Sequence, residues 1–282
     1  MSKINNIKID KQNRLHDLQT YDFKNLVFAD PYEATIKGTN PPLKYQKINI
    51  LTKNEKTREV EQPGGTLAYE EDLDMRDSMG DLLFLMDNMF SFGVQENRDF
   101  NNDKLTGYTM SIALDDQHNP SERQLKTVSQ FEKLILECKK HLLANRKALK
   151  LPKLDESDLK SMNNLIYQKK DEDGDRVPGT SSTISPKLSD CDDGDQKKII
   201  TKFYLEGELD DDGEPVEVDP LKYLSDAAKK NFKFCHVRPV VKIESIYIGS
   251  TISIQLRITE AIITPPKPKT QTSLLHRQLK RK

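Results

Sequence analysis

Lysines and arginines alternate with aromatic residues in several short stretches of this sequence. Residues 44–47 read Lys-Tyr-Gln-Lys, residues 202–204 read Lys-Phe-Tyr, and residues 230–234 read Lys-Asn-Phe-Lys-Phe. Cations pair with phosphates and exposed rings stack on bases, so these types together predict a surface that holds a single nucleic-acid strand without reading its sequence. The candidate binding residues are Lys44, Tyr45, Lys47, Arg58, Lys202, Tyr204, Lys230, Phe232, Lys233, Phe234, Arg238, Lys242, Tyr247, Arg257, Lys280 and Arg281.

For any one ring, burial in the core is the competing interpretation. Phe203, between Lys202 and Tyr204, is a further candidate stacking platform, and burial in the core is the alternative for this ring too.

Residue patterns that support catalysis or cofactor binding are absent from the sequence. There is no Gly-x-x-x-x-Gly-Lys-Ser/Thr loop, and no Gly-x-Gly-x-x-Gly follows a predicted strand. Among possible zinc ligands only Cys235 and His236 are close in the sequence. Adjacent side chains on a strand point to opposite faces, so these two do not form a zinc site. Residues 208–219 imitate a calcium loop, but Pro215 interrupts it. The sequence predicts a protein that is not an enzyme and has no cofactor and no metal.

Charge is nearly balanced in total but segregated along the chain. Residues 171–219 contain 16 acids and 5 bases, a net charge of −11, and since the whole chain carries −1, the remainder carries +10. Three basic stretches contain no acid: residues 139–153, 229–242 and 267–282. Any one of them is most simply a solvated face, but three together favour a polyanionic partner.

Alternation of apolar and polar residues predicts most of the strands. Residues 24–29, 44–51, 107–114 and 197–205 read as strands, and the turn at 53–56 predicts that 44–51 forms a hairpin with 57–60. The apolar stretch 82–94 fits either strands or a short helix, and we interpret it as strand. Residues 232–248 and 251–263, joined by Gly249-Ser250, predict a long closing β-hairpin.

One long helix and two short ones are expected. Ser121 followed by Gln124 forms a capping box, and apolar residues at helical spacing continue from there to the region before Pro152. Shorter helices are predicted at about 155–166 and at 219–224.

These elements predict one domain with extensions. Residues 1–20 are an N-terminal extension, residues 21–264 a single nucleic-acid-binding domain, and residues 265–282 a basic tail rich in Pro and Lys. Within the domain, residues 169–196 contain almost nothing apolar and are expected to form a disordered acidic insertion. The fold class is β-rich α+β: an OB-like antiparallel barrel with an inserted long helix and helical and acidic insertions.

Composition argues for a protein of the cytoplasm. The chain has 282 residues, of which 35% are hydrophobic and 32% charged, and no apolar run approaches the ~18 residues that a membrane helix needs. The start of the chain lacks the features of a secretory signal. The three cysteines are far apart, so we expect reduced thiols.

Two segments resemble a known family. They are residues 44–50, followed by a charged hairpin and Gly-Gly-Thr at 64–66, and the closing stretch 246–256. They are similar to an OB-fold single-stranded-DNA-binding family of nucleocytoplasmic large DNA viruses, which has a member in African swine fever virus. The resemblance runs in order over residues 24–264, but the acidic stretch and the tail have no match. It implies an OB fold, a role in viral DNA replication or repair, and a location in the host cytoplasm, at the viral replication site or in the virion.

Partners and alternatives follow from these features. Single-stranded DNA is the expected partner, with RNA as the alternative strand, and the acidic segment or the tail could contact a replication protein. A structural or virion interaction protein that does not bind nucleic acid is the alternative function, and a divergent enzyme is the third. Binding that ignores nucleic acid and salt would identify the structural protein.

The tail generates a first prediction. Removing residues 267–282 should leave the melting temperature nearly unchanged, since the extended basic tail supplies no core side chain. It should weaken binding of a single-stranded oligonucleotide at low salt and flatten the dependence of affinity on salt, because fewer phosphates are neutralised. Fluorescence anisotropy measures both effects. If the truncated and full chains bind equally at every salt concentration, the tail belongs to a protein partner.

Overall fold

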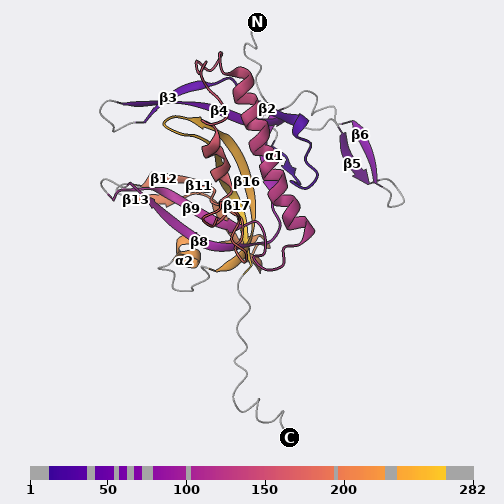
Figure 1. The fold of residues 1–282 in the computed structure, drawn as a ribbon. Coiled ribbons are helices and arrows are strands. Elements are labelled where there is room, and N and C mark those ends of the chain that lie inside the picture. Colours follow the sequence, from indigo (N-terminus) through magenta and orange to yellow (C-terminus); the bar gives the residue numbers. More distant parts are fainter. Residues whose placement is uncertain are drawn as a thin grey trace.

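The computed structural model describes residues 13–36, 42–53, 57–61, 67–71, 79–99, 103–193, 196–225 and 234–264. For residues 36, 57–61, 67–71, 193 and 196 it describes the backbone alone. The protein is rich in strands, with one long helix and a closed barrel of five strands (Figure 1). None of the helices in these ranges is long and apolar enough to cross a membrane.

The barrel closes through five strands that come from three distant parts of the sequence. They are β8 (Met89–Arg98), β9 (Leu105–Ala113), β11 (Lys187–Leu188), β16 (Cys235–Ile248) and β17 (Ile252–Thr264). Pairing runs antiparallel from β8 to β9 and from β9 to β11, then parallel from β11 to β17. β17 pairs antiparallel with β16, and β16 returns antiparallel to β8. The expected barrel with one long helix is confirmed at this level.

β16 joins the barrel to an outer group of strands. One edge of β16 pairs with β17, and its other edge takes β8, β7 (Met79–Leu85) and β4 (Leu43–Lys53) one after another. The remaining strands add to the edges of this sheet. They are β1 (Leu15–His16) on β7, β2 (Leu26–Phe28) and β3 (Tyr32–Ile36) on β4, β10 (Thr183–Ile184) on β9, β14 (Lys202–Leu209) on β17 and β15 (Pro215–Glu217) on β14.

Two hairpins stand outside this sheet. They are β5 (Thr57–Glu61) with β6 (Leu67–Glu71), and β12 (Asp190–Asp193) with β13 (Gln196–Ile199). The expected hairpin of residues 44–51 with 57–60 is therefore wrong, because β4 pairs with β7 while β5 pairs with β6. The apolar stretch 82–94 is confirmed as strand, in β7 and β8.

The long helix α1 (Glu122–Asn145) begins at the expected capping box. The Ser121 hydroxyl accepts a hydrogen bond from the Gln124 backbone, and the Gln124 side chain accepts one from the Ser121 backbone. The apolar stripe, including Phe131 and Leu142, is buried as its spacing predicts. The second expected helix is only a 3₁₀ helix, η3 (Lys160–Leu165), and α2 (Pro220–Leu224) is N-capped by Asp219. A short 3₁₀ turn, η1 (Phe23–Asn25), precedes β2.

The N-terminal boundary also differs from the expectation. Leu18 is 2% exposed, and the Gln130 side chain of α1 donates a hydrogen bond to its carbonyl, so residues 15–20 belong to the fold. Leu18 is a single apolar residue between polar neighbours, a pattern that does not indicate packing against the core. The tail at 265–282 lies outside the described residues.

Residues 169–193, expected to be disordered, are ordered and supply one strand of the barrel. β10 and β11 come from this segment, and Ile184 and Leu188 are each 1% exposed. The prediction of disorder was wrong because it weighed average composition, whereas two buried side chains at the right places are enough to anchor a short strand.

A buried carboxylate fixes the same segment. Asp115 is 2% exposed, and its oxygens accept two hydrogen bonds from the Arg176 guanidinium, at 2.8 and 3.1 Å. They also accept hydrogen bonds from the backbone and the hydroxyl of Ser182, at 2.7 and 3.1 Å. The charge is therefore paired and its lone pairs are used, as burial requires.

We expect Asp115→Ala to lower the free energy of unfolding by about 3 kcal/mol, because it leaves the Arg176 charge and the Ser182 backbone without their acceptor. Urea unfolding followed by circular dichroism measures this change. Asp173→Ala is the matched control, since Asp173 is exposed in the same segment and its change should stay within about 0.5 kcal/mol. Equal effects of the two variants would contradict a structural role for Asp115.

Candidate nucleic-acid interface

A row of tyrosines and a lysine crosses the outer face of the sheet. Strand register places Tyr32 of β3 beside Lys47 of β4, Lys47 beside Tyr247 of β16, and Tyr247 beside Ser253 of β17. Tyr45, two residues from Lys47 on the same strand face, brings its ring centroid to 5.0 Å from that of Tyr247. Three of the sequence-predicted residues, Tyr45, Lys47 and Tyr247, are thus neighbours.

The turn after β16 makes room for the Tyr247 ring. A Cβ atom on Gly249 would clash with the phenol of Tyr247, so glycine at this turn allows the ring to lie where it does. The Gly249-Ser250 turn that the sequence predicts therefore also shapes the candidate surface.

Next to the tyrosines lies a cluster of three cations around one carboxylate, which we call the basic cluster: Lys47, Lys187, Arg257 and Glu244. The Lys47 ammonium lies 2.7 Å from one oxygen of Glu244, and the Arg257 guanidinium lies 3.1 Å from the other. Arg257 also donates a hydrogen bond to the backbone oxygen of Leu188. The cluster carries a net charge of +2, although the chain as a whole carries −1.

Lys187 is the cation of this cluster with no ion pair in the described part of the chain. It sits directly beside Arg257 in the β11–β17 register. Partial burial, followed by repulsion from Arg257, lowers the pKa of its ammonium group. An anion bound here would relieve that repulsion, so Lys187 is suited to hold a phosphate.

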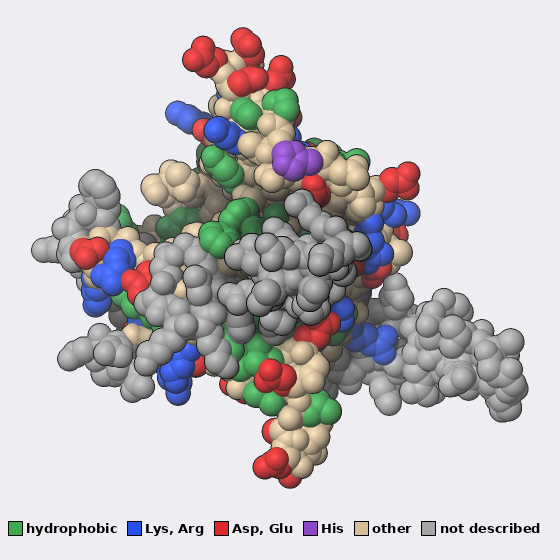
Figure 2. Space-filling view, turned by 90° about the horizontal axis from the view of Figure 1, so that it is seen from below, with side chains coloured by type: hydrophobic (Ala, Val, Ile, Leu, Met, Phe, Trp, Pro, Cys, Tyr) green, Lys and Arg blue, Asp and Glu red, His purple; other side chains and the backbone are tan. Residues whose placement is uncertain are grey.

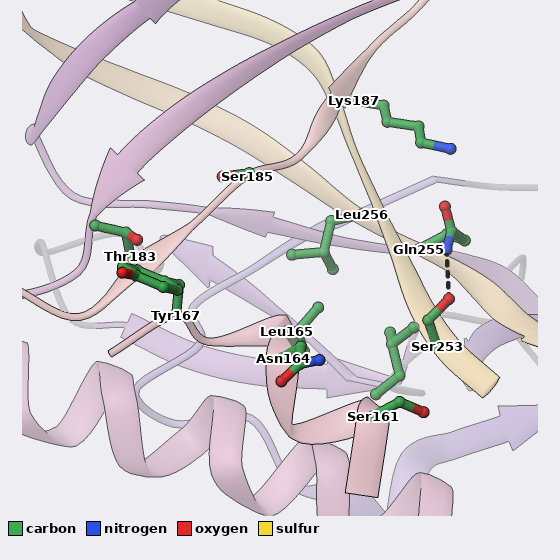
Figure 3. A pocket seen from close by; sticks show the side chains of 11 residues that line it. Ser161, Asn164, Leu165, Tyr167, Thr183, Ser185, Lys187, Ser253, Gln255 and Leu256 are labelled. Carbon is green, nitrogen blue, oxygen red and sulfur yellow. Dashed lines mark hydrogen bonds between the residues drawn. The ribbon is translucent and has the colours of Figure 1, made fainter. Parts of the chain in front are cut away.

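Beside Lys187 a pocket of about 200 Å³ opens between η3 and β17 (Figure 3). Gln255 and Ser253 lie on one side of it, joined by a hydrogen bond of 2.8 Å, and Tyr167 and Thr183 lie on the opposite side. Leu256 lies between the two sides. Hydroxyl, amide and apolar groups therefore converge next to a lysine that forms no ion pair with the described residues.

Four other predicted residues form a second group. Register aligns Tyr204 of β14, Ile262 of β17 and Arg238 of β16, and the Phe234 ring stacks on Phe90 at 6.2 Å. Lys202, also on β14, lies 3.9 Å from Glu217. Arg238 and Tyr247 are nine positions apart on β16, which corresponds to roughly 30 Å at about 3.3 Å per residue. The structure therefore divides the predicted residues between two places.

The second group lies toward the end of the molecule where β16 begins and β17 ends. Figure 2 looks onto that end, and among the described residues hydrophobic side chains come to the surface around the middle of the view while acidic side chains project at its upper and lower margins. Phe234 is 58% exposed and Ile262 is 37% exposed. The described residues of this surface are more apolar than basic, so they fit phosphate binding less well than the basic cluster does.

The remaining predicted residues contribute less or are not described. Lys242 lies beside Arg257, but Asp81 holds its ammonium at 2.6 Å, and Lys44 is exposed on β4. Phe203 is 0% exposed, so its interpretation as a stacking platform was wrong and it belongs to the core. The Arg58 side chain and the residues Lys230, Phe232, Lys233, Lys280 and Arg281 lie outside the described part of the structure.

Sequence reasoning missed Lys187, Tyr32 and Tyr167. Lys187 lies in the expected acidic insertion at 169–196, where eight acids outnumber four bases. Tyr32 and Tyr167 are 44% and 64% exposed, but neither stands in a basic stretch. The Pro186-Lys187-Leu188 sequence, with an apolar residue after the lysine, was the only local sign of a strand at that point.

The fold and the basic cluster define a strand-rich barrel protein with a tyrosine-lined, positively charged outer face. The chain belongs to the family described as "Protein of unknown function (DUF2738)", which matches residues 19–280. A comparison with curated proteins gave no match.

The buried position of Glu244 generates a prediction about acid stability. Burial alone would raise the pKa of its carboxyl group, but the hydrogen bond and charge of Lys47 and the charge of Arg257 outweigh burial and lower this pKa below its usual 4.5. The stability contributed by Glu244 is therefore complete above pH 4.5 and is lost as the pH falls through the lowered value.

Glu244→Gln should remove this part of the pH dependence. The wild-type free energy of unfolding should fall more steeply than that of the variant between about pH 5 and pH 3, as measured by urea unfolding at each pH. Glu206→Gln, at an exposed carboxylate of β14, serves as the control. Parallel pH profiles for wild type and Glu244→Gln would contradict the assignment.

Proposed function

We propose that this protein binds single-stranded DNA through the face that carries the basic cluster and the neighbouring tyrosines. The observation that carries the proposal is the juxtaposition of the Tyr45–Tyr247 ring pair with Lys47, Arg257 and Lys187. The two rings are half-buried, and their open parts supply stacking surfaces for unpaired bases while the cations supply contacts for phosphates, which together favour a single strand over a duplex.

The strand connectivity supports an OB-like barrel as part of this proposal. In chain order the barrel strands are β8, β9, β11, β16 and β17, and the third pairs in parallel with the fifth to close the barrel, as in an OB fold. OB barrels bind oligonucleotides on the face of the second and third strands. Those strands here are β9 and β11, and β11 carries Lys187. The long helix α1 departs from the usual pattern, because it follows the second barrel strand.

The proposal includes little sequence preference and a role in viral DNA replication or repair. Cations and stacked rings recognise features that all bases share, which accounts for tolerance of sequence. The viral role rests on the resemblance of residues 44–50 and 246–256 alone.

Lys187→Ala tests the phosphate contact without breaking an ion pair. It should weaken binding to a single-stranded oligonucleotide about fivefold at low salt and reduce the magnitude of the log–log salt slope by about 0.7, one phosphate contact. Fluorescence anisotropy titrations with single- and double-stranded oligonucleotides measure both quantities.

Lys126→Ala is the matched control, since it removes the same charge from the exposed side of α1. It should leave the affinity within twofold of the wild-type value. A flat salt response of the wild type, or equal effects of the two variants, would rule out binding at this face.

A further inference from the structure

The pocket between η3 and β17 offers a flat ring, hydrogen-bonding amides and an unpaired cation within one small space. Tyr167 is 64% exposed at its margin, although two backbone hydrogen bonds with Thr183, at 2.8 and 2.9 Å, hold its main chain in place. The backbone at Tyr167 is therefore held in place, and its ring is presented to solvent at the margin of the pocket.

Two side-chain amides reach the same space with unused hydrogen-bonding capacity. The Asn164 amide makes no hydrogen bond within the described ranges, and Gln255 uses only its nitrogen, which donates to Ser253. An amide presents a donor and an acceptor side by side, which is the arrangement that pairs with the edge of a nucleobase.

The size of the pocket limits what can enter it. Pockets for drug-sized ligands measure about 300–1,000 Å³, whereas this one measures about 200 Å³. It suits one flat ring system and is too small for a whole nucleotide. The sugar and phosphate of an entering nucleotide would therefore stay outside the pocket, and Lys187 stands at its margin, beyond Gln255.

We propose that this pocket is a subsite for a single nucleobase of the bound strand, with the Tyr167 ring as its stacking surface and the Asn164 and Gln255 amides as contacts to its edge. The inference rests on the proposed function and adds a base-dependent contact at one position to an otherwise sequence-tolerant surface. Leu165 and Leu256 line the apolar part of the pocket, so the faces of a base that enters are removed from water.

The first experiment compares oligonucleotides with and without bases. Tyr167→Ala should weaken binding of single-stranded DNA about tenfold, the loss expected for one stacked base, and should leave the affinity for an abasic oligomer of equal length unchanged. Anisotropy competition measures both affinities. Leu136→Ala, at a side chain of α1 that is 50% exposed, is the control for removal of apolar surface.

The outcomes separate the two proposals. If the wild type binds neither oligomer, the proposed function fails and this inference fails with it. If the wild type binds DNA in a Lys187-dependent manner but Tyr167→Ala binds as well as the wild type, only the base subsite is overturned. An equal loss for DNA and the abasic oligomer would also overturn it, because Tyr167 would then act on the backbone or on the fold. Displacement of DNA by an acidic peptide with the same dependence on Tyr167 would assign the pocket to a protein partner instead.

The second experiment uses two adjacent asparagines. Asn163 and Asn164 stand side by side in η3, but Asn163 accepts a hydrogen bond from Lys139 at 2.7 Å, whereas Asn164 lines the pocket. Wild-type affinities for dT, dC and dA homopolymers of equal length should differ by at least about fivefold. Asn164→Ala should reduce this spread and Asn163→Ala should keep it. Equal wild-type affinities, or equal effects of the two variants, would overturn the role of the amides.

Discussion

Closure of the barrel depends on two residues. Lys187 and Leu188 are the whole of β11, yet they pair with β9 on one side and with β17 on the other. Without them β9 and β17 would each have an unpaired stretch of edge opposite β11, which proteins generally avoid. Leu188 supplies the buried anchor, and the hydrogen bonds of Asp115 with Arg176 and Ser182 hold the segment that leads to it. The barrel, the basic cluster and the pocket beside η3 all exist only while this short strand is in place.

Local patterns account for the parts of the fold that are long and regular. Alternation predicted β9 and β17, the long apolar stretch before the Gly249-Ser250 turn predicted β16, and the capping box at Ser121 predicted α1, because each signal lies within a few neighbouring residues. Pairing between distant segments was not predictable in this way. The hydrogen bonds from Arg176 to Asp115 span 61 residues, and nothing near Asp115 marks it as a buried acceptor. The candidate site follows the same division: Tyr45, Lys47, Tyr247 and Arg257 lie on strands with clear alternation, whereas Lys187 lies on a two-residue strand that no periodicity can reveal.

The basic cluster is positively charged although the whole chain carries a net charge of −1. Glu244 is shared by Lys47 and Arg257, so it fixes both cations in position while neutralising only one of them. The positive surface is therefore ordered as well as charged, and its side chains lose little conformational freedom when an anion arrives. Acidic side chains elsewhere, such as those of the turn between β14 and β15, lower the net charge without entering this face.

Lys187 has two different tasks in one residue: its backbone closes the barrel, and its ammonium stands open to an anion. Binding and closure must therefore be linked thermodynamically. Under the proposed function, an anion that binds the closed form more tightly than the open form adds to the stability of β11 as its concentration rises above its dissociation constant. Local opening of β11 would release the same ligand. The hydrogen-exchange rates of the β11 amides should therefore report whether an anion is bound to the outer face.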